Sequence, residues 1–155
     1  MKEFVDNSGT RWNVELTIAS IKRVRDLLSV NLLEPESGEP PLLTRLGSDI
    51  ILLCDVIYVL VKPQADAQNV SDEQFGELLG GDAILLAQEA FYQELIDFFL
   101  RSGRPDKLRM IEKQRALIAA AIAMAEKKVE AINTDEICSK SFTNLPGLPA
   151  SSPTA

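Results

Sequence analysis

The hydrophobic period changes once along this chain, and that change constrains the fold more than any other feature. Apolar residues first alternate with polar ones, as in a half-buried β-strand, at Trp12, Val14, Leu16 and Ile18. Residues 2–5 have the pattern of a second short strand, and residues 6–9, Asp-Asn-Ser-Gly, are typical of a tight turn. The sequence therefore predicts a β-hairpin over residues 2–18. Because an isolated hairpin is marginal in water, its apolar face is expected to lie on helices or on another chain's sheet.

From Thr17 onward the apolar residues recur with the helical period of about 3.6, interrupted by prolines and glycines. The predicted fold class is mainly α (α+β), in which the N-terminal hairpin precedes a bundle of about five helices within a single domain, residues 1–132. The predicted helices cover about residues 18–30, 42–61, 72–79, 83–100 and 107–132. The proline- and serine-rich segment 133–155 is expected to be a flexible tail, because its composition cannot pack a core.

Polar residues predict where three of these helices begin. Thr17 is an expected N-cap, and so is Ser71, where Gln74 three positions later completes a capping box. Asp82 follows a glycine pair and is expected to cap the next helix.

The segment 42–61 is apolar nearly all round, which is typical of a helix that is central in a bundle or covered by a partner. Gly47-Ser48-Asp49 predicts a break and a new cap within it. Lys62-Pro63 is expected to end it, because proline lacks the backbone N–H that a helix interior needs.

The chain has no histidine, and its two cysteines, Cys54 and Cys138, lie far apart in the sequence. The commonest general base and the commonest metal ligand are therefore missing. Two distant cysteines fit neither a disulfide scaffold nor a zinc site. We therefore expect a protein that is not an enzyme, with no catalytic residue, no cofactor and no metal.

The most interesting carboxylates are Asp49 and Asp55, which lie in the apolar segment 42–61. A carboxylate in apolar surroundings must be paired, hydrogen-bonded or protonated. We expect pairing, with Arg45 or with a base from residues 101–115, and keep an acid-base role for the two carboxylates as a minor alternative.

The net charge of −7 is unevenly distributed. Residues 31–100 hold thirteen acidic and two basic side chains, whereas residues 101–115 hold six bases and two acids. The basic segment is expected to form a solvated face that docks on the acidic middle of the chain. Nucleic acid is not expected as a partner, because aromatic residues are not interleaved with these bases.

Neither a secretory signal nor a membrane span is expected. The N-terminus has no apolar run after its first charges, and the longest apolar stretch, Ile50–Val61, is shorter than the roughly twenty residues that a span requires. We therefore expect a cytoplasmic protein.

The segment 107–132 has a regular heptad pattern, with apolar residues spaced alternately three and four apart and one charged interruption at Arg115. Such a seam requires a helical partner, either within the chain or in another protein. The alanine-rich stretch 116–125 would let a neighbouring helix come close. The candidate partner-contact residues are Ile111, Ile118, Ile122 and Val129 in the seam, and Phe142, Leu145 and Leu148 in the tail.

Over residues 2–100 the sequence resembles small tail proteins of phages and prophages that are grouped with tail assembly chaperones. The resemblance lies in Phe4–Trp12, Val14–Thr17, Ile21–Val24, Val70–Phe75, Gly81–Ala83 and Leu95–Phe99. It implies a small, acidic, mostly helical protein without catalytic residues.

The resemblance also implies that the chain binds the long helical tape-measure protein, or another tail protein, in the host cytoplasm during assembly. The alternative is a structural virion subunit, a tail or connector component whose copies assemble through the exposed edge of the hairpin. That alternative leaves a homo-oligomer open.

Overall fold

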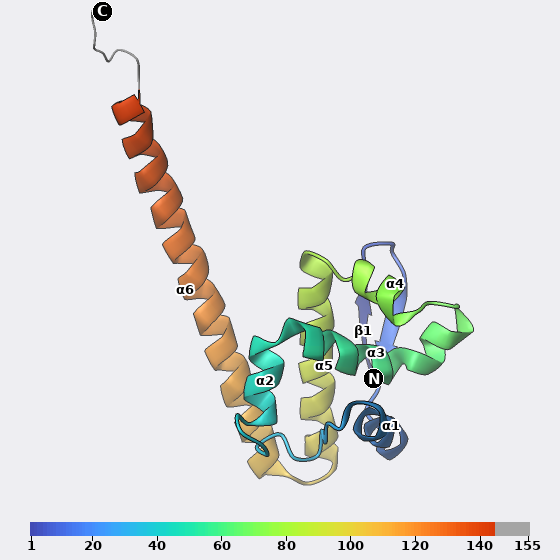
Figure 1. Ribbon diagram of the computed structural model, residues 1–155. Helices are drawn as coiled ribbons and strands as arrows, with labels where there is room; N and C mark the ends of the chain where they lie inside the picture. Colours follow the sequence, from blue (N-terminus) through green and yellow to red (C-terminus); the bar gives the residue numbers. More distant parts are fainter. Residues whose placement is uncertain (145–155) are drawn as a thin grey trace, which may run out of the picture. The chain divides into compact units, whose positions relative to one another are not determined.

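A computed structural model describes the backbone of residues 1–144 and the side chains of residues 1–117, 119–120 and 123–128. Along the chain its elements are β1 (Lys2–Val5), β2 (Arg11–Val14), α1 (Ile18–Leu28), α2 (Leu42–Ser48), α3 (Ile50–Ala67), α4 (Asp72–Glu77), α5 (Asp82–Arg101) and α6 (Pro105–Asn144) (Figure 1). The predicted mainly α class, with an N-terminal hairpin, is confirmed. The chain divides into two compact units, Met1–Arg115 and Ala116–Ala155, and the division falls within α6.

The predicted hairpin is present, and one carboxylate organises its turn. Strands β1 and β2 are antiparallel, with Phe4 opposite Trp12. In the turn, Asp6 Oδ1 accepts the backbone N–H groups of Ser8 at 2.9 Å and Thr10 at 3.0 Å. Asp6 Oδ2 accepts the Trp12 indole N–H at 2.8 Å, so this carboxylate joins the turn to the largest side chain of the core.

The apolar face of the hairpin packs on helices of the same chain, with α5 along β1 and α3 along β2. Trp12, Val14 and Leu16 are buried as predicted. The prediction is wrong for Ile18, which is 67% exposed. The reason is that Thr17 caps α1, so Ile18 is already the first helical residue and no longer follows the period of the strand.

Helix boundaries agree with the predicted caps at Thr17 and Ser71, where the Thr17 and Ser71 side chains each complete a capping box. The predicted cap at Asp82 is wrong. Gly81, with φ +63°, occupies the N-cap position of α5, and Asp82 is the first helical residue. There its carboxylate lies in the first turn, where the helix dipole favours negative charge.

The long apolar segment breaks where predicted, since α2 ends at Ser48 and Asp49 caps α3. The predicted end at Lys62-Pro63 is wrong, because α3 continues through Pro63 to Ala67. Proline at this position cannot donate to the carbonyl of Val59, four residues earlier. The Arg23 guanidinium of α1 donates to that carbonyl instead, at 2.8 Å, and so satisfies the acceptor that Pro63 leaves free.

Helix α6 continues past the predicted end at Ile132 to Asn144. No proline or glycine lies between Asp106 and Leu145, so no helix-breaking residue interrupts this segment. The rest of the predicted tail, residues 145–155, lies outside the described residues. In the part of the chain that is described, no helix is long and apolar enough to cross a membrane.

The interior of the first unit contains one fully buried carboxylate, Glu94 of α5. Its Oε2 accepts the backbone N–H of Leu16 at 2.9 Å, where the chain leaves β2. The Met1 amino group lies 3.1 Å from its Oε1, and Arg101 lies 3.8 Å from Oε2. Glu94 therefore fixes the exit of the hairpin to α5.

Candidate functional site

The partner-contact residues predicted from the sequence fall into three groups. Ile111 is completely buried within the first unit, so it belongs to the core of that unit and not to an accessible seam. The seam residues Ile118, Ile122 and Val129 and the tail residue Phe142 lie on the helical backbone of α6, and their side chains are outside the description. Leu145 and Leu148 lie outside the described residues altogether.

The described side chains of α6 add an apolar feature that the heptad pattern did not identify. Leu117 is 57% exposed and Met124 is 72% exposed. They are seven residues apart and therefore share one side of the helix, about 100° round from the predicted seam. Their exposure could have been suspected from the sequence, because residues 116–125 contain no polar residue on any side.

The basic segment docks on the acidic middle of the chain, as predicted. Lys107, whose side chain is 8% exposed, donates to both oxygens of Glu36, at 2.5 and 2.7 Å. The hydrogen bond from Lys107 holds the pKa of Glu36 below its ordinary value. Arg115 donates to Oε1 of Glu89 of α5. These two bases are therefore engaged within the first unit.

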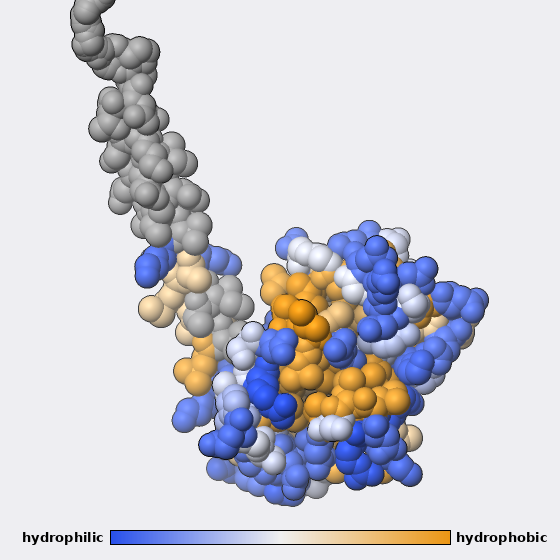
Figure 2. Space-filling view, viewed as in Figure 1, coloured by the Kyte–Doolittle hydropathy of each residue, from blue (hydrophilic) through white to orange (hydrophobic). Residues whose placement is uncertain are grey.

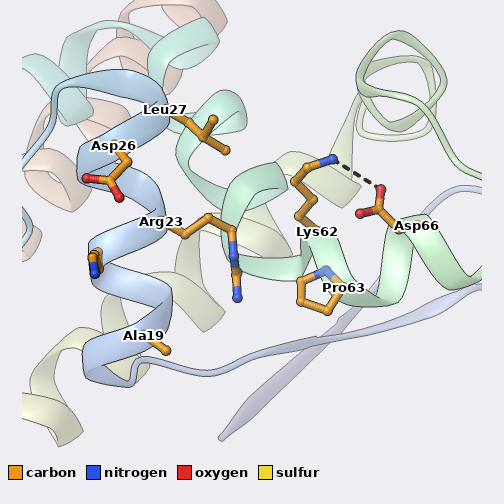
Figure 3. A pocket seen from close by; sticks show the side chains of 8 residues that line it. Ala19, Arg23, Asp26, Leu27, Lys62, Pro63 and Asp66 are labelled. Carbon is orange, nitrogen blue, oxygen red and sulfur yellow. Dashed lines mark hydrogen bonds and ion pairs between the residues drawn. The ribbon is translucent and has the colours of Figure 1, made fainter.

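A hollow of about 560 Å³ lies between α1 and α3 (Figure 3). Its lining residues are Ala19, Lys22, Arg23, Asp26, Leu27, Lys62, Pro63 and Asp66. Two of its three cations already have partners, because Lys62 pairs with Asp66 at 3.1 Å and Arg23 donates to the Val59 carbonyl. The hollow therefore has no concentration of free positive charge. The Arg23 hydrogen bond beside it connects α1 with the turn of α3 that precedes Pro63.

That connection gives a prediction for Arg23→Ala. The substitution should lower the free energy of unfolding by about 1–2 kcal/mol, because it leaves a carbonyl of α3 without a donor. In a Pro63→Ala background the same substitution should cost less than about half as much, since an alanine at this position restores the backbone N–H that bonds the Val59 carbonyl. Urea unfolding of the four proteins measures the coupling. Lys22→Ala, which changes another base of the same hollow, is the control, and equal costs of Arg23→Ala in both backgrounds would contradict the assignment.

A second hollow, of about 490 Å³, lies where α3 begins, against α4 and the start of α5. Its apolar wall includes Ile51, which is 71% exposed. Figure 2 shows apolar surface gathered where α3 and α5 are seen. Its polar lining consists of Cys54, Asp55, Asp72 and Glu73.

The carboxylates of this region are not paired as predicted. Asp49 accepts the backbone N–H groups of Ile51 and Leu52, both at 3.1 Å, and so serves as a cap. In the described part of the chain, Asp49 and Asp55 form no ion pair with Arg45 or with the segment 101–115. The reason is that Asp49 is used at the helix start, while Asp55 faces the second hollow.

Two groups in the second hollow have raised pKa values. Burial, and then the charges of Asp72 and Asp49, raises the pKa of Asp55. Burial, and then the charges of Asp55 and Asp72, raises the pKa of Cys54 to about 11. The thiol is therefore neutral near pH 7 and a poor nucleophile. An acid-base role for Asp49 and Asp55 stays a minor alternative.

A groove of about 360 Å³ runs between β1 and α5. It is lined by all four residues of β1 and by Leu86, Glu89, Ala90 and Gln93 of α5. It combines an edge strand with a helix wall, and it is the one hollow described here that contains the hairpin edge on which the structural-subunit alternative depends.

Among the side chains that the structure describes, residues 1–117, 119–120 and 123–128, no three or more His, Cys, Asp or Glu lie together as a metal site would require. Comparisons of the chain with protein-family models, with curated proteins and with solved structures give no match.

Proposed function

We propose that this protein is a non-enzymatic assembly protein that binds an α-helical segment of a partner protein through α6. The proposed class is a phage tail assembly chaperone, and the proposed partner is the long helical tape-measure protein. The observation that supports the proposal best is the apolar segment 116–125 of α6.

This segment has the sequence ALIAAAIAMA, ten residues without a polar side chain. A helix without a polar face normally lies in a protein interior. Here every described side chain of the segment is exposed: Ala116, Leu117, Ala119, Ala120, Ala123, Met124 and Ala125. Covering Leu117 and Met124 alone would contribute about 1.5–3 kcal/mol each, which favours a partner.

The composition of the segment favours a helix as the partner. Six of its ten residues are alanine, and small side chains at a helix contact allow a short distance between the two axes. The predicted seam through Ile118 and Ile122 has the spacing of a coiled-coil surface. A tape-measure protein, which is long and helical, offers matching apolar faces that would otherwise aggregate.

Co-expression with the protein of the neighbouring reading frame tests this proposal, provided that this frame encodes a long helical protein. We expect a soluble complex that survives affinity purification and size-exclusion chromatography. The double variant Leu117→Asp/Met124→Asp should abolish the complex, because it places two charges in the apolar contact.

Lys127→Glu is the matched control, since it changes an exposed residue of α6 just beyond the apolar segment, and it should leave the complex intact. Circular dichroism of each variant shows whether the helix is retained. A complex that is insensitive to the double variant, or two purified proteins that never associate, would refute the proposal. A large ring formed by this chain alone would instead support the structural-subunit alternative.

A further inference from the structure

The rest of the fold covers one edge of the hairpin and leaves the other edge open. At the outer edge of β2, the Gln64 side chain of α3 takes the place of a neighbouring strand. Its Oε1 accepts the backbone N–H of Asn13 at 3.1 Å, and its Nε2 donates to the backbone carbonyl of Arg11 at 2.7 Å. Gln64 thus satisfies two of the four outward-facing backbone groups of Arg11 and Asn13, and its side chain covers that edge of β2.

The outer edge of β1 is open. Arg11 and Asn13 point their backbone groups away from β1, so their cross-strand partners Val5 and Glu3 must point theirs away from β2. The bond from the Asp6 N–H to the Thr10 carbonyl at 3.0 Å gives the same alternation. In the described residues, the N–H and C=O groups of Glu3 and Val5 have no hydrogen-bond partner. They form the row of donors and acceptors that a further strand requires.

The groove between β1 and α5 has the dimensions of one extended segment. Residues 86–93 of α5, which form its helix wall, rise by roughly 10 Å, and the four residues of β1 extend roughly 13 Å. A segment of about four extended residues therefore fits along the groove. A second copy of β1 fits less well, because it carries its own α5 along the same edge, and the two helices would meet.

The groove does not favour a charged segment over an uncharged one, because its own charged side chains already form ion pairs. Lys2 pairs with Asp97 at 2.8 Å, Glu3 pairs with Arg11 at 3.0 Å, and Glu89 pairs with Arg115 of α6. The surface that remains free is apolar, with Leu86 53% exposed.

We propose that the groove between β1 and α5 binds an extended, uncharged segment of about four residues from another protein, which adds to the hairpin as a third strand. Main-chain hydrogen bonds from Glu3 and Val5 hold the segment, and an apolar side chain of the segment lies against Leu86. This site is independent of the apolar segment of α6, so it stands whether or not α6 binds a helix.

A display library of random heptapeptides, selected against the full-length protein, supplies the probe. We expect uncharged peptides with an apolar residue at alternate positions. N-methylation of a selected peptide at the alternate positions that face β1 should weaken binding about tenfold or more, as expected for the loss of main-chain bonds. N-methylation at the intervening positions should change the affinity less than about twofold. Equal sensitivity at both sets of positions would overturn strand addition.

Two variants of the protein test the site itself. Val5→Pro removes an outward N–H without removing a bond between β1 and β2, and it should weaken binding about tenfold, whereas Val5→Thr should not. Leu86→Asp should also weaken binding, and Leu100→Asp, at another exposed leucine of α5, should not. Thermal unfolding followed by circular dichroism verifies that each variant folds. If Val5→Pro does not fold, the comparison of Leu86→Asp with Leu100→Asp decides the question.

Amide hydrogen exchange of the isolated protein gives a second readout. The Glu3 and Val5 amides should exchange quickly in the monomer and become protected when the peptide binds. Protection in the free monomer would show that the chain covers its own edge. Protection that grows with protein concentration would show that a second copy occupies the groove. Either result would overturn the proposal.

Discussion

Phe75→Ala is expected to lower the free energy of unfolding by about 3–5 kcal/mol, the usual cost of removing a large buried aromatic side chain. Phe75 is completely buried and is the only buried residue of α4. Its ring centroid lies 5.1 Å from that of Trp12, 5.3 Å from that of Tyr58 and 6.4 Å from that of Phe4. The alanine variant therefore loses contacts to both hairpin strands and to α3 at once.

Thermal or urea unfolding measured by circular dichroism tests this expectation. Glu77→Ala is the matched control, because Glu77 is exposed on the same short helix and should change stability by less than about 0.5 kcal/mol. A loss below about 1 kcal/mol for Phe75→Ala would mean that α4 does not hold the hairpin against α3.

Asp6→Asn is expected to cost about 1–3 kcal/mol near neutral pH. The carboxylate is 5% exposed and accepts four hydrogen bonds, from the Trp12 indole, the Ser8 hydroxyl and the backbone N–H groups of Ser8 and Thr10. Both oxygens of Asp6 accept hydrogen bonds. An amide N–H₂ group in place of either oxygen would therefore point its own N–H groups at a donor, and the hydrogen bond would be lost. The variant keeps the shape of the side chain and removes only its acceptor capacity.

The pH dependence gives a second expectation for the same residue. Burial raises the pKa of Asp6, but the hydrogen bonds from Trp12, Ser8 and Thr10 together outweigh it and hold the pKa below its ordinary value of 3.8. The contribution of Asp6 to stability is therefore fully present above about pH 4 and is lost as the pH falls through the lowered pKa. The stability difference between the native protein and Asp6→Asn should narrow as the pH falls below 3.8.

Unfolding curves recorded at neutral pH and at several values below about pH 4 measure this difference. Asp26→Asn is the control, because Asp26 is exposed and makes a single 3.7 Å pair with Arg25. A difference between native protein and Asp6→Asn that stays constant across the acid range would contradict the assigned role of the carboxylate.

Much of the fold could be predicted because the signals are local. The alternation at Trp12 and Val14, the capping boxes at Thr17 and Ser71, and the break at Asp49 depend on residues within a few positions of one another. Such interactions join neighbours in the sequence, so they form whatever the rest of the chain packs against the segment. They determined the class, the order of the elements and most of the helix starts.

The errors occurred where a distant residue changes the outcome of a local rule. Pro63 has the local signal of a helix end, but Arg23, forty positions earlier, donates to the carbonyl that Pro63 leaves free, and α3 continues. The sequence predicts an ion pair for Asp49, but its carboxylate accepts the backbone N–H groups of Ile51 and Leu52 in its own helix instead. No sequence pattern around Pro63 contains the information that Arg23 is close.

The same distinction applies to the candidate sites. The apolar segment 116–125 is evident from ten adjacent residues, whereas the exposure of Leu117 and Met124 depends on the tertiary structure. The groove at β1 could not be found from the sequence. It depends on Gln64 closing β2 from a distance of about fifty residues and on α5 forming a wall along β1.

By itself the sequence determined a mainly α chain that begins with a hairpin, carries its negative charge in residues 31–100 and has an apolar helical segment before its C-terminal part. These properties follow from period, capping and composition, which need no knowledge of tertiary contacts. Only the tertiary structure decided which hairpin edge is closed, which proline is tolerated and which bases are already paired. Those outcomes depend on hydrogen bonds and ion pairs between residues far apart in the chain, and their partners are chosen by packing.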